Sequence, residues 1–385
     1  MKSAFLKSKI ENGRVFMTMT KRERVISAIQ HRTPDRLPVN DSFWEDTLSR
    51  WIKEGLADAV VPREHFDFDI ADFSIDASPG FEAKLLSEDN EFFTLQDRFG
   101  YVARKTKGKS RTIDYMSYPV PDRDCWATVK HMFMNKQTNE RTLIDDIGFP
   151  FRFDPEPTWE QAQRKLEAVR TDDYYVLASA YGPHEATWRL HGFTDTLMDI
   201  AMDAEFIIEI ASTYVDSLIE TLQCCKDKGL APDGFWMIDD VAATRGMLFS
   251  PDHWRQIYKP LVQKLGDFLK DAGIHFWMHS CGNCEPIFDD LVECGLQVIN
   301  PLEAKSGLDV CELKEKYGDT LCFYGNIDVH TMSGDEADCK HEIKRKLSCF
   351  NQGGGYIYHS DHSVPPEVSL AHYRKVMEFV RKYGT

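Results

Sequence analysis

Ile274-His275-Phe276-Trp277-Met278-His279-Ser280-Cys281 is an apolar run that ends in polar residues. The apolar part, Ile274–Met278, is too short for a buried helix and is typical of a buried strand in a parallel sheet. The same pattern recurs from residue 174 onward, each time followed by an amphipathic segment. The other runs are Tyr175–Ala180, Gly234–Ile238, Gln297–Asn300, Leu321–Tyr324 and Tyr356–Tyr358. Strands that alternate with helices predict a βα-repeat fold.

The intervening segments have helical periodicity. Asp203–Lys228 keeps apolar residues on one face, and Ser250 with Pro251 is a good start for a helix that runs through Leu269. Two earlier runs, Arg36–Val39 and Phe68–Phe73, bring the predicted strands to eight. We therefore predict an α/β fold, a (β/α)8 TIM barrel. A doubly wound open sheet is the alternative, but no Gly-rich phosphate loop follows an early strand.

The region Phe81–Pro157 interrupts this pattern. It is polar and turn-rich, and its alternating runs at Phe92–Leu95 and Gly100–Lys105 predict an inserted hairpin with a lid-like excursion. We expect one barrel domain over residues 19–385 with an insertion at about 81–157. Residues 1–18 are expected to be a leader, which need not be ordered.

Bulk properties exclude several classes of protein. The chain has 385 residues and a net charge of −16, which argues against nucleic-acid or anionic-lipid binding. No apolar run is long enough for a membrane span, and the amino terminus lacks an apolar signal core, so a cytoplasmic location is expected. The ten cysteines form no secreted-type framework. We expect most to be inert core residues: Cys224, Cys225, Cys294, Cys322, Cys339 and Cys349.

Polar residues gather where the predicted strands end. The carboxyl ends of barrel strands converge on one face, where active sites form. The residues that follow these strands are Asp239 and Asp240; His279, Ser280, Cys281 and Cys284; Asn300 and Glu303; Asn326 and Asp328; and His359, Asp361 and His362.

His279 and Cys281 are the pair among these residues that most specifically indicates a metal site. At the end of an extended strand, residues two apart point to the same side, and imidazole with thiolate is a zinc-type pair. A third ligand must then come from another strand end, with His359, Asp361 and His362 as the candidates. The alternative is that His279 only hydrogen-bonds a neighbour and Cys281 is a small buried residue. Cys281 and Cys284 could also form a redox dithiol, although the thioredoxin-like context is lacking.

Asp239 and Asp240 have two interpretations. They could orient the substrate or a ligand, or they could be acidic residues at a helix amino terminus.

Several motifs resemble those of the uroporphyrinogen decarboxylase superfamily, within it the zinc-dependent corrinoid methyltransferase branch. They are Thr20–Val25, Arg36–Val39, Asp239-Asp240, Gly325–Asp328 and Gly354–Ile357, and the resemblance runs from Met19 to Tyr383. It implies zinc ligands at His279 and Cys281. The later cysteine of that branch falls on His362 here, so either His362 replaces it or a residue such as Asp361 completes the site. The decarboxylase holds its acidic substrate with an arginine-rich segment, and Asn40–Trp44 stands there without a cation.

The resemblance implies a methyltransferase. A site with one thiolate fewer leaves Zn²⁺ a better Lewis acid, which suits a methyl ether, aryl ethers included, as the small methylated substrate. No Asp-x-His-x-x-Gly segment occurs, so the corrinoid (cobalamin) that takes the methyl group is expected on a separate protein. Asp239, Asp240 and Asn326 are the expected catalytic residues of a monomer or homodimer. The alternatives are transfer from a methylated corrinoid to a thiol such as coenzyme M, and a non-catalytic barrel that binds a corrinoid protein.

Overall fold

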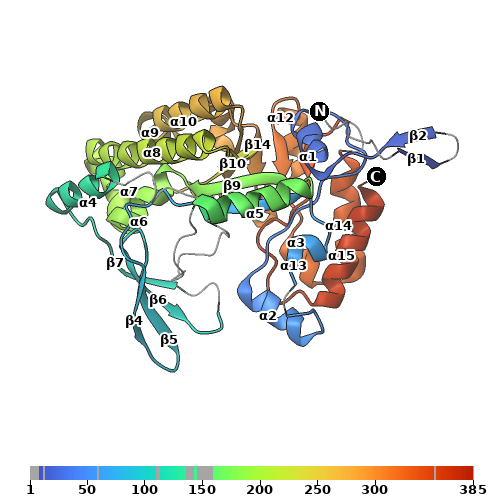
Figure 1. Cartoon of the computed structure of the whole chain (residues 1–385), viewed down its shortest axis with the longest axis horizontal. Helices are drawn as coiled ribbons and strands as arrows, with labels where there is room; N and C mark the ends of the chain where they lie inside the picture. Colours follow the sequence, from blue (N-terminus) through green and yellow to red (C-terminus); the bar gives the residue numbers. More distant parts are fainter. Residues whose placement is uncertain are drawn as a thin grey trace.

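Seven parallel strands form the central sheet of the computed structural model, which describes residues 8–11, 14–58, 60–109, 113–135, 143–144, 159–350 and 353–384. The sheet curls, and helices cover its outer side (Figure 1). The strands, in spatial order, are β16 (Tyr356–Ile357), β15 (Cys322–Tyr324), β14 (Val298–Asn300), β13 (His275–His279), β10 (Gly234–Ile238), β9 (Tyr175–Tyr181) and β3 (Ile70–Ile75). The α/β fold and the parallel sheet are therefore confirmed. A short strand, β8 (Leu143–Ile144), pairs antiparallel with β3.

The predicted strand at Arg36–Val39 is wrong as an extended element. This segment contributes a one-residue parallel bridge between Val39 and Tyr358, beyond the end of β16. On its other side the Asp69 N–H donates to the Val39 carbonyl at 2.8 Å. The segment thus lies between the two ends of the curled sheet. Pro38 has no N–H to donate, which limits the ladder that this segment can form.

One set of inward-facing side chains fills the interior of the curled sheet. Alternate residues of successive strands point inward, as the two-residue period of a strand requires. The set comprises Ile70, Tyr175, Leu177, Trp236, Trp277, Val298, Cys322, Tyr324 and Ile357. Val25, Ala28 and Ile29 of α1 (Lys21–Ile29) join this cluster and close its amino-terminal end.

From β9 onward the helices follow the strands in sequence, as predicted, and α2 to α5 precede β9. They are α2 (Glu45–Lys53), α3 (Pro62–His65), α4 (Arg123–Asn135), α5 (Trp159–Thr171), α6 (Pro183–His191), α7 (Phe193–Met202), α8 (Ala204–Asp227), α9 (Pro251–Ile257), α10 (Lys259–Ala272), α11 (Phe288–Glu293), α12 (Val310–Tyr317), α13 (Val329–Ser333), α14 (Glu336–Ser348) and α15 (Leu370–Tyr383). Asp203 caps α8, and Ser250 caps α9 by accepting from the His253 N–H. The helix predicted through Leu269 breaks at Tyr258, because Pro260 lacks an N–H for a continuous helix.

The insertion has more strands than the predicted hairpin, and the predicted lid-like excursion stays a prediction. Between β3 and β9 the chain forms a separate antiparallel sheet that extends away from the curled sheet (Figure 1). Its strands are β4 (Lys84–Glu88), β5 (Phe92–Gln96), β6 (Val102–Thr106) and β7 (Ile113–Ser117). Of the rest of the predicted insertion, residues 136–142 and 145–157 lie outside the described part of the chain. In the predicted leader, Ser8–Glu11 (β1) and Arg14–Met17 (β2) form an antiparallel pair, and residues 1–7, 12 and 13 are likewise outside it.

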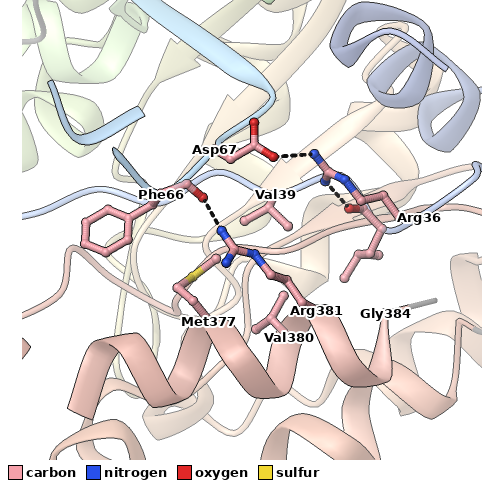
Figure 2. Close-up of a pocket in the computed structure, with 9 residues that line it drawn as sticks. Arg36, Val39, Phe66, Asp67, Met377, Val380, Arg381 and Gly384 are labelled. Atoms are coloured by element: carbon pink, nitrogen blue, oxygen red, sulfur yellow. Dashed lines mark hydrogen bonds and ion pairs between the residues drawn. The ribbon is translucent and has the colours of Figure 1, made fainter. Parts of the chain in front are cut away.

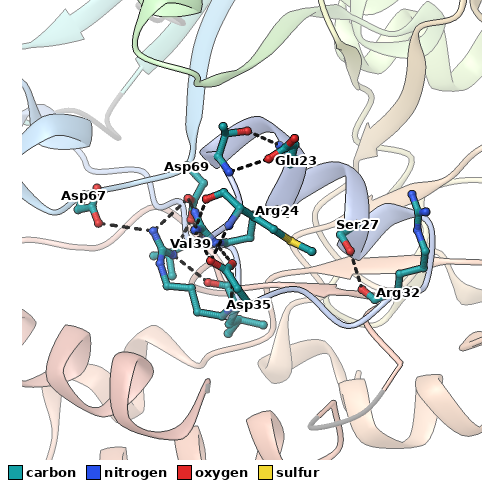
Figure 3. Close-up of polar contacts among 12 residues, drawn as sticks. Glu23, Arg24, Ser27, Arg32, Asp35, Val39, Asp67 and Asp69 are labelled. Carbon is teal, nitrogen blue, oxygen red and sulfur yellow. Dashed lines mark hydrogen bonds and ion pairs between the residues drawn. The ribbon is translucent and has the colours of Figure 1, made fainter. Parts of the chain in front are cut away.

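Buried ion pairs hold the amino-terminal end of the sheet (Figure 3). Asp69, fully buried just before β3, accepts from Arg24 at 2.6 Å, from Arg36 at 2.8 Å and from the Val39 N–H at 2.8 Å. Asp35 binds the other side of the Arg24 guanidinium at 2.7 Å. These carboxylates satisfy a buried cation that would otherwise be costly.

A small cavity of about 40 Å³ lies near the same end, between the Arg36–Val39 segment and α15 (Figure 2). Its wall includes Met377, Val380 and the Arg381 guanidinium, which donates to the Phe66 carbonyl at 2.9 Å. It lies away from the carboxyl ends of the strands, where barrel active sites form.

Two further features concern the whole chain. None of the helices in the part that the structure describes is both long and apolar enough to cross a membrane. Cys311 of α12 and Cys349, the residue after α14, form a disulfide. The expectation that Cys349 is an inert core thiol is therefore wrong, because the fold brings it to Cys311, which lies 38 residues away in the sequence.

Candidate metal centre

The predicted pair His279 and Cys281 lies at the carboxyl end of β13. Trp277 faces the interior, so the strand period also turns His279 inward. The Sγ atom of Cys281 lies 3.4 Å from Nε2 of His279, and both residues are partly exposed. The two side chains therefore point toward each other, as one shared cation requires.

Asn300 fixes the orientation of the His279 ring. It stands opposite His279 in the register of β13 and β14. Its amide nitrogen donates to the Tyr324 carbonyl at 2.8 Å, so its oxygen faces His279 Nδ1 at 2.7 Å and accepts from it. The hydrogen then resides on Nδ1, and the Nε2 lone pair faces Cys281. A ligating histidine is commonly held in this way.

Asp240 completes a first group of ligand atoms with these two residues. Its Oδ1 accepts from the Cys281 N–H at 2.8 Å and lies 3.5 Å from His279 Nε2. One atom each from Asp240, His279 and Cys281 lies within 4.8 Å of the others. Asp240 follows β10, so adjacent strands supply this group.

A second group shares Cys281 and adds His362 and Glu303, with ligand atoms again within 4.8 Å of one another. Burial lowers the pKa of His362 to about 4, which keeps its imidazole neutral and able to coordinate. Its ring stacks on Trp44 at 5.4 Å between centroids. The predicted third ligand, His362, is thus brought to Cys281, and its role as a ligand stays a prediction.

Glu303 is a strand-end residue that the sequence offers as a zinc ligand only if His362 is not the third ligand. Burial alone would raise its pKa, but the Lys305 ammonium at 2.8 Å and the Gly282 N–H at 2.8 Å hold the pKa below its ordinary value. The carboxylate is therefore charged and oriented toward Cys281. Its position, three residues beyond the β14 strand end, was the one available signal.

The chemistry of the donor set fits a divalent metal ion. Burial raises the pKa of the Cys281 thiol well above its ordinary value, and Asp240 and Glu303 raise it further. A cation among these groups would stabilise the thiolate and offset the neighbouring carboxylates. Thiolate, imidazole and carboxylate together are typical ligands of zinc. The structure thus offers Cys281, His279, His362, Glu303 and Asp240 as candidate ligands.

The other candidate residues have different surroundings. Asp361, the alternative third ligand, accepts from the Val329 N–H at 2.9 Å and the Ala304 N–H at 3.0 Å, and it belongs to neither group. Cys284, the alternative redox partner, is buried, and burial raises its pKa to about 12. Such a thiol is a poor nucleophile.

Asp239 is buried at the amino terminus of α6. Its Oδ1 accepts from the Glu185 N–H at 2.8 Å, which agrees with the helix-terminal interpretation. A Cβ on Gly182 would lie 2.3 Å from the Asp239 side chain, so only glycine allows this approach. Burial raises the pKa of Asp239 well above its ordinary value.

Asn326 is fully buried and its amide contacts backbone groups. It donates to the carbonyls of Leu302 at 2.5 Å and Leu308 at 2.8 Å, and it accepts from the Val310 N–H at 2.9 Å. These bonds hold the loop that carries Glu303. Its predicted catalytic role stays a prediction.

Comparison with known proteins adds to this geometry. A family model described as uroporphyrinogen decarboxylase (URO-D) matches residues 159–383. A uroporphyrinogen decarboxylase of Chlorobium phaeovibrioides is 25% identical over 175 residues, which cover 44% of this chain and 47% of that protein. One of Chlorobaculum tepidum is 24% identical over 99 residues, 25% of this chain and 27% of that protein. The matched region thus spans about half or less of these curated relatives.

A solved structure described as a methyltransferase from Methanosarcina mazei is similar over nearly the whole chain. The TM-score is 0.64 at 16% identity, and the superposition covers 95% of this chain and 100% of the other. At this identity the likeness supports the fold of the curled parallel sheet and its helices.

Proposed function

The chain belongs to the uroporphyrinogen decarboxylase family, and within it we propose a zinc-dependent methyltransferase that moves a methyl group from a small methyl ether to a corrinoid protein. The observation that carries the proposal is the convergence of two groups of ligand atoms on Cys281. The likeness to a methyltransferase structure supports the same branch of the family.

His279, Cys281, His362 and Glu303 are the residues that would hold the ion. Zinc bound there would supply Lewis acidity to the ether oxygen of the methyl donor. Asn300 keeps the His279 lone pair directed at the site, and the Asp240 carboxylate holds the Cys281 backbone. These contacts prearrange the ligands before the substrate binds.

Glu303 changes the expected charge of the site. With one thiolate and only imidazoles the ion would keep a net charge of about +1, whereas the Glu303 carboxylate adds a second negative ligand. Carboxylate oxygen is nevertheless a harder and weaker electron donor than thiolate sulfur. An ion in this site would therefore still be a better Lewis acid than an ion held by two thiolates. That difference favours activation of an oxygen-bound methyl group.

Asp239, Asp240 and Asn326 are positioning residues in this proposal. Asp239 joins the end of β10 to the start of α6, and Asn326 holds the Glu303 loop through backbone contacts. Asp239 and Asn326 belong to neither group of ligand atoms, whereas Asp240 belongs to the first. We expect their substitution to alter the arrangement of ligands more than the chemical step.

A decarboxylase function is disfavoured by the segment Asn40–Trp44. This stretch carries no cation, and Asp41 is a buried carboxylate that accepts from Tyr373 at 2.8 Å. A segment without a cation cannot neutralise the carboxylates of an acidic tetrapyrrole.

A reconstituted reaction tests the proposal. The zinc-loaded protein is mixed with a reduced corrinoid protein and a series of methyl ethers, and methylation of the corrinoid is followed by absorbance. We expect transfer from an ether that is lost after removal of the metal and restored by zinc. Transfer only in the opposite direction, from methylated corrinoid to a thiol, would contradict the ether assignment. X-ray absorption with coenzyme M would then show a new sulfur ligand on zinc.

A further inference from the structure

The disulfide between Cys311 and Cys349 joins the first turn of α12 to the residue that follows α14. Both cysteines are partly exposed, and exposed disulfides are more labile than those enclosed in a core. All ten cysteines lie in the described part of the chain, and the other eight are free thiols. A framework built for stability would use several disulfides, whereas one disulfide among many thiols is typical of a redox-sensing pair.

Asn326 lies between the two helices that the disulfide joins. Its Oδ1 accepts from the N–H of Val310, the residue before Cys311, at 2.9 Å. Its backbone carbonyl accepts from the ammonium of Lys346, which lies three residues before Cys349 and is 2% exposed. The disulfide therefore joins the same two ends of α12 and α14 that hold Asn326 from either side.

Asn326 in turn holds the loop that carries Glu303. Its amide nitrogen donates at 2.5 Å to the carbonyl of Leu302, the neighbour of Glu303, and at 2.8 Å to the carbonyl of Leu308. The Glu303 carboxylate belongs to the group of ligand atoms at Cys281. A continuous series of covalent and hydrogen bonds thus runs from the disulfide to a candidate zinc ligand, and such a series can carry coupling between two sites.

Other contacts keep α12 and α14 together when the disulfide is open. Arg345 of α14 pairs with Asp309, the residue that caps α12, at 2.5 Å. The Lys314 ammonium donates to the Cys349 carbonyl at 2.6 Å. The Arg345 side chain is 43% exposed, so its ion pair stabilises the contact only weakly. Opening the disulfide should therefore leave the helices packed but remove the covalent limit on their separation.

We propose that Cys311 and Cys349 form a redox site that exchanges with a protein dithiol and sets the zinc affinity of the candidate metal centre through Asn326 and Glu303. A thiolate of the dithiol attacks one sulfur, breaks the Cys311–Cys349 bond and forms a mixed disulfide. The second thiol of the dithiol then displaces the bound cysteine. The chain gains two electrons and two protons as two thiols, and the dithiol loses the same and becomes a disulfide. The inference rests on the proposed function, because it names a regulation of the same metal site.

Reversible reduction of the wild type tests the proposal. Thioredoxin, with its reductase and NADPH, supplies the dithiol, and alkylation with peptide mass mapping detects new thiols at Cys311 and Cys349. After thioredoxin is removed, competition with a chromophoric chelator measures the zinc affinity of the oxidised and the reduced protein. We expect the oxidised protein to bind zinc about tenfold more tightly. The double variant Cys311→Ser, Cys349→Ser should have the affinity of the reduced protein before and after treatment.

Two further variants separate coupling through Glu303 from a general loss of stability. In Glu303→Gln the oxidised and reduced forms should bind zinc equally, because the ligand that the disulfide positions is absent. Cys125→Ser removes a partly exposed thiol that lies outside the disulfide. This control variant should keep the tenfold ratio of the wild type.

Three results would each overturn the inference: a disulfide that thioredoxin leaves intact, equal zinc affinity of the oxidised and reduced wild type, and a ratio that persists in Glu303→Gln. The proposed function would stand after any of them if the oxidised protein binds zinc and transfers methyl groups. Absence of zinc binding and of transfer from every ether in both redox states would instead contradict the proposed function, so the two failures are distinguishable.

Discussion

Asn300 Oδ1 accepts a hydrogen bond from His279 Nδ1 at 2.7 Å, and this contact turns the His279 Nε2 lone pair toward Cys281. The contact follows from the register of β13 and β14, in which the two residues stand side by side. It links the parallel sheet to the candidate metal centre.

Asn300→Ala should weaken zinc binding about 10- to 100-fold while leaving the ligands in place, because the His279 ring loses the partner that fixes its tautomer. Competition with a chromophoric chelator measures the affinity. Unchanged zinc affinity in a folded Asn300→Ala variant would show that Asn300 stabilises only the end of β14 and does not orient His279 for zinc.

The ligand set around Cys281 is tested by three variants. His362→Ala and Glu303→Gln should each lower zinc affinity, because each removes a ligand from the group at Cys281. Asp361→Asn is the comparison variant: it keeps one of the two acceptors for the Val329 and Ala304 N–H groups and removes no member of either group of ligand atoms, so a smaller loss of zinc affinity is expected. Normal zinc affinity in both His362→Ala and Glu303→Gln would mean that neither residue is a ligand. The ligands would then be His279, Cys281 and Asp240.

We predict that the titration of Asp97 makes the stability of the folded protein depend on pH. Burial raises its pKa to about 7 against an ordinary 3.8, although Arg189 opposes the shift. Since the folded pKa is the higher one, the stabilisation is complete below the unfolded pKa and is lost as pH rises through about 7. Between about pH 6 and pH 8.5 the wild type should lose about 1 kcal/mol relative to Asp97→Asn, as followed by urea unfolding. A difference that does not change with pH would contradict this.

Asp69→Ala should lower the free energy of unfolding by about 3–5 kcal/mol, because it leaves the buried Arg24 cation without one of its carboxylates. Asp67→Asn is the control, because Asp67 has a φ of 54°, which asparagine tolerates better than alanine. Asp67 also contacts Arg36, at 3.5 Å, but its side chain is 60% exposed, so a change below about 1 kcal/mol is expected. Denaturant unfolding compares the two variants. Equal losses of the free energy of unfolding in the two variants would contradict this prediction. They would mean that the buried ion pairs of Asp69 stabilise the protein no more than the exposed ion pair of Asp67.

The sequence predicted those parts of the fold that local patterns determine. The predicted strand Gly234–Ile238 has the same bounds as β10, since a buried parallel strand is a continuous apolar run between polar ends. The break at Tyr258 was missed because the apolar periodicity continues past Pro260. The sheet β4 to β7 is larger than predicted, because β4 and β7 are mostly exposed and lack the apolar alternation that indicates a strand at β5 and β6.

Only part of the candidate site could be predicted, because local patterns relate only residues that are close together along the chain. Spacing within one strand end brought His279 and Cys281 together, and the resemblance supplied His362. The role of Asn300 depends on the register of two strands, and that of Glu303 on a loop held by Asn326. Neither relationship is encoded by spacing along the chain.

Metal analysis of the purified wild type beside Cys281→Ser tests the central claim most directly. We predict about one zinc ion per wild-type chain and none in Cys281→Ser, with the same circular dichroism spectrum for both proteins, because both groups of ligand atoms share the Cys281 sulfur. A wild type that transfers methyl groups without any metal, or a serine variant that retains full zinc, would contradict the account.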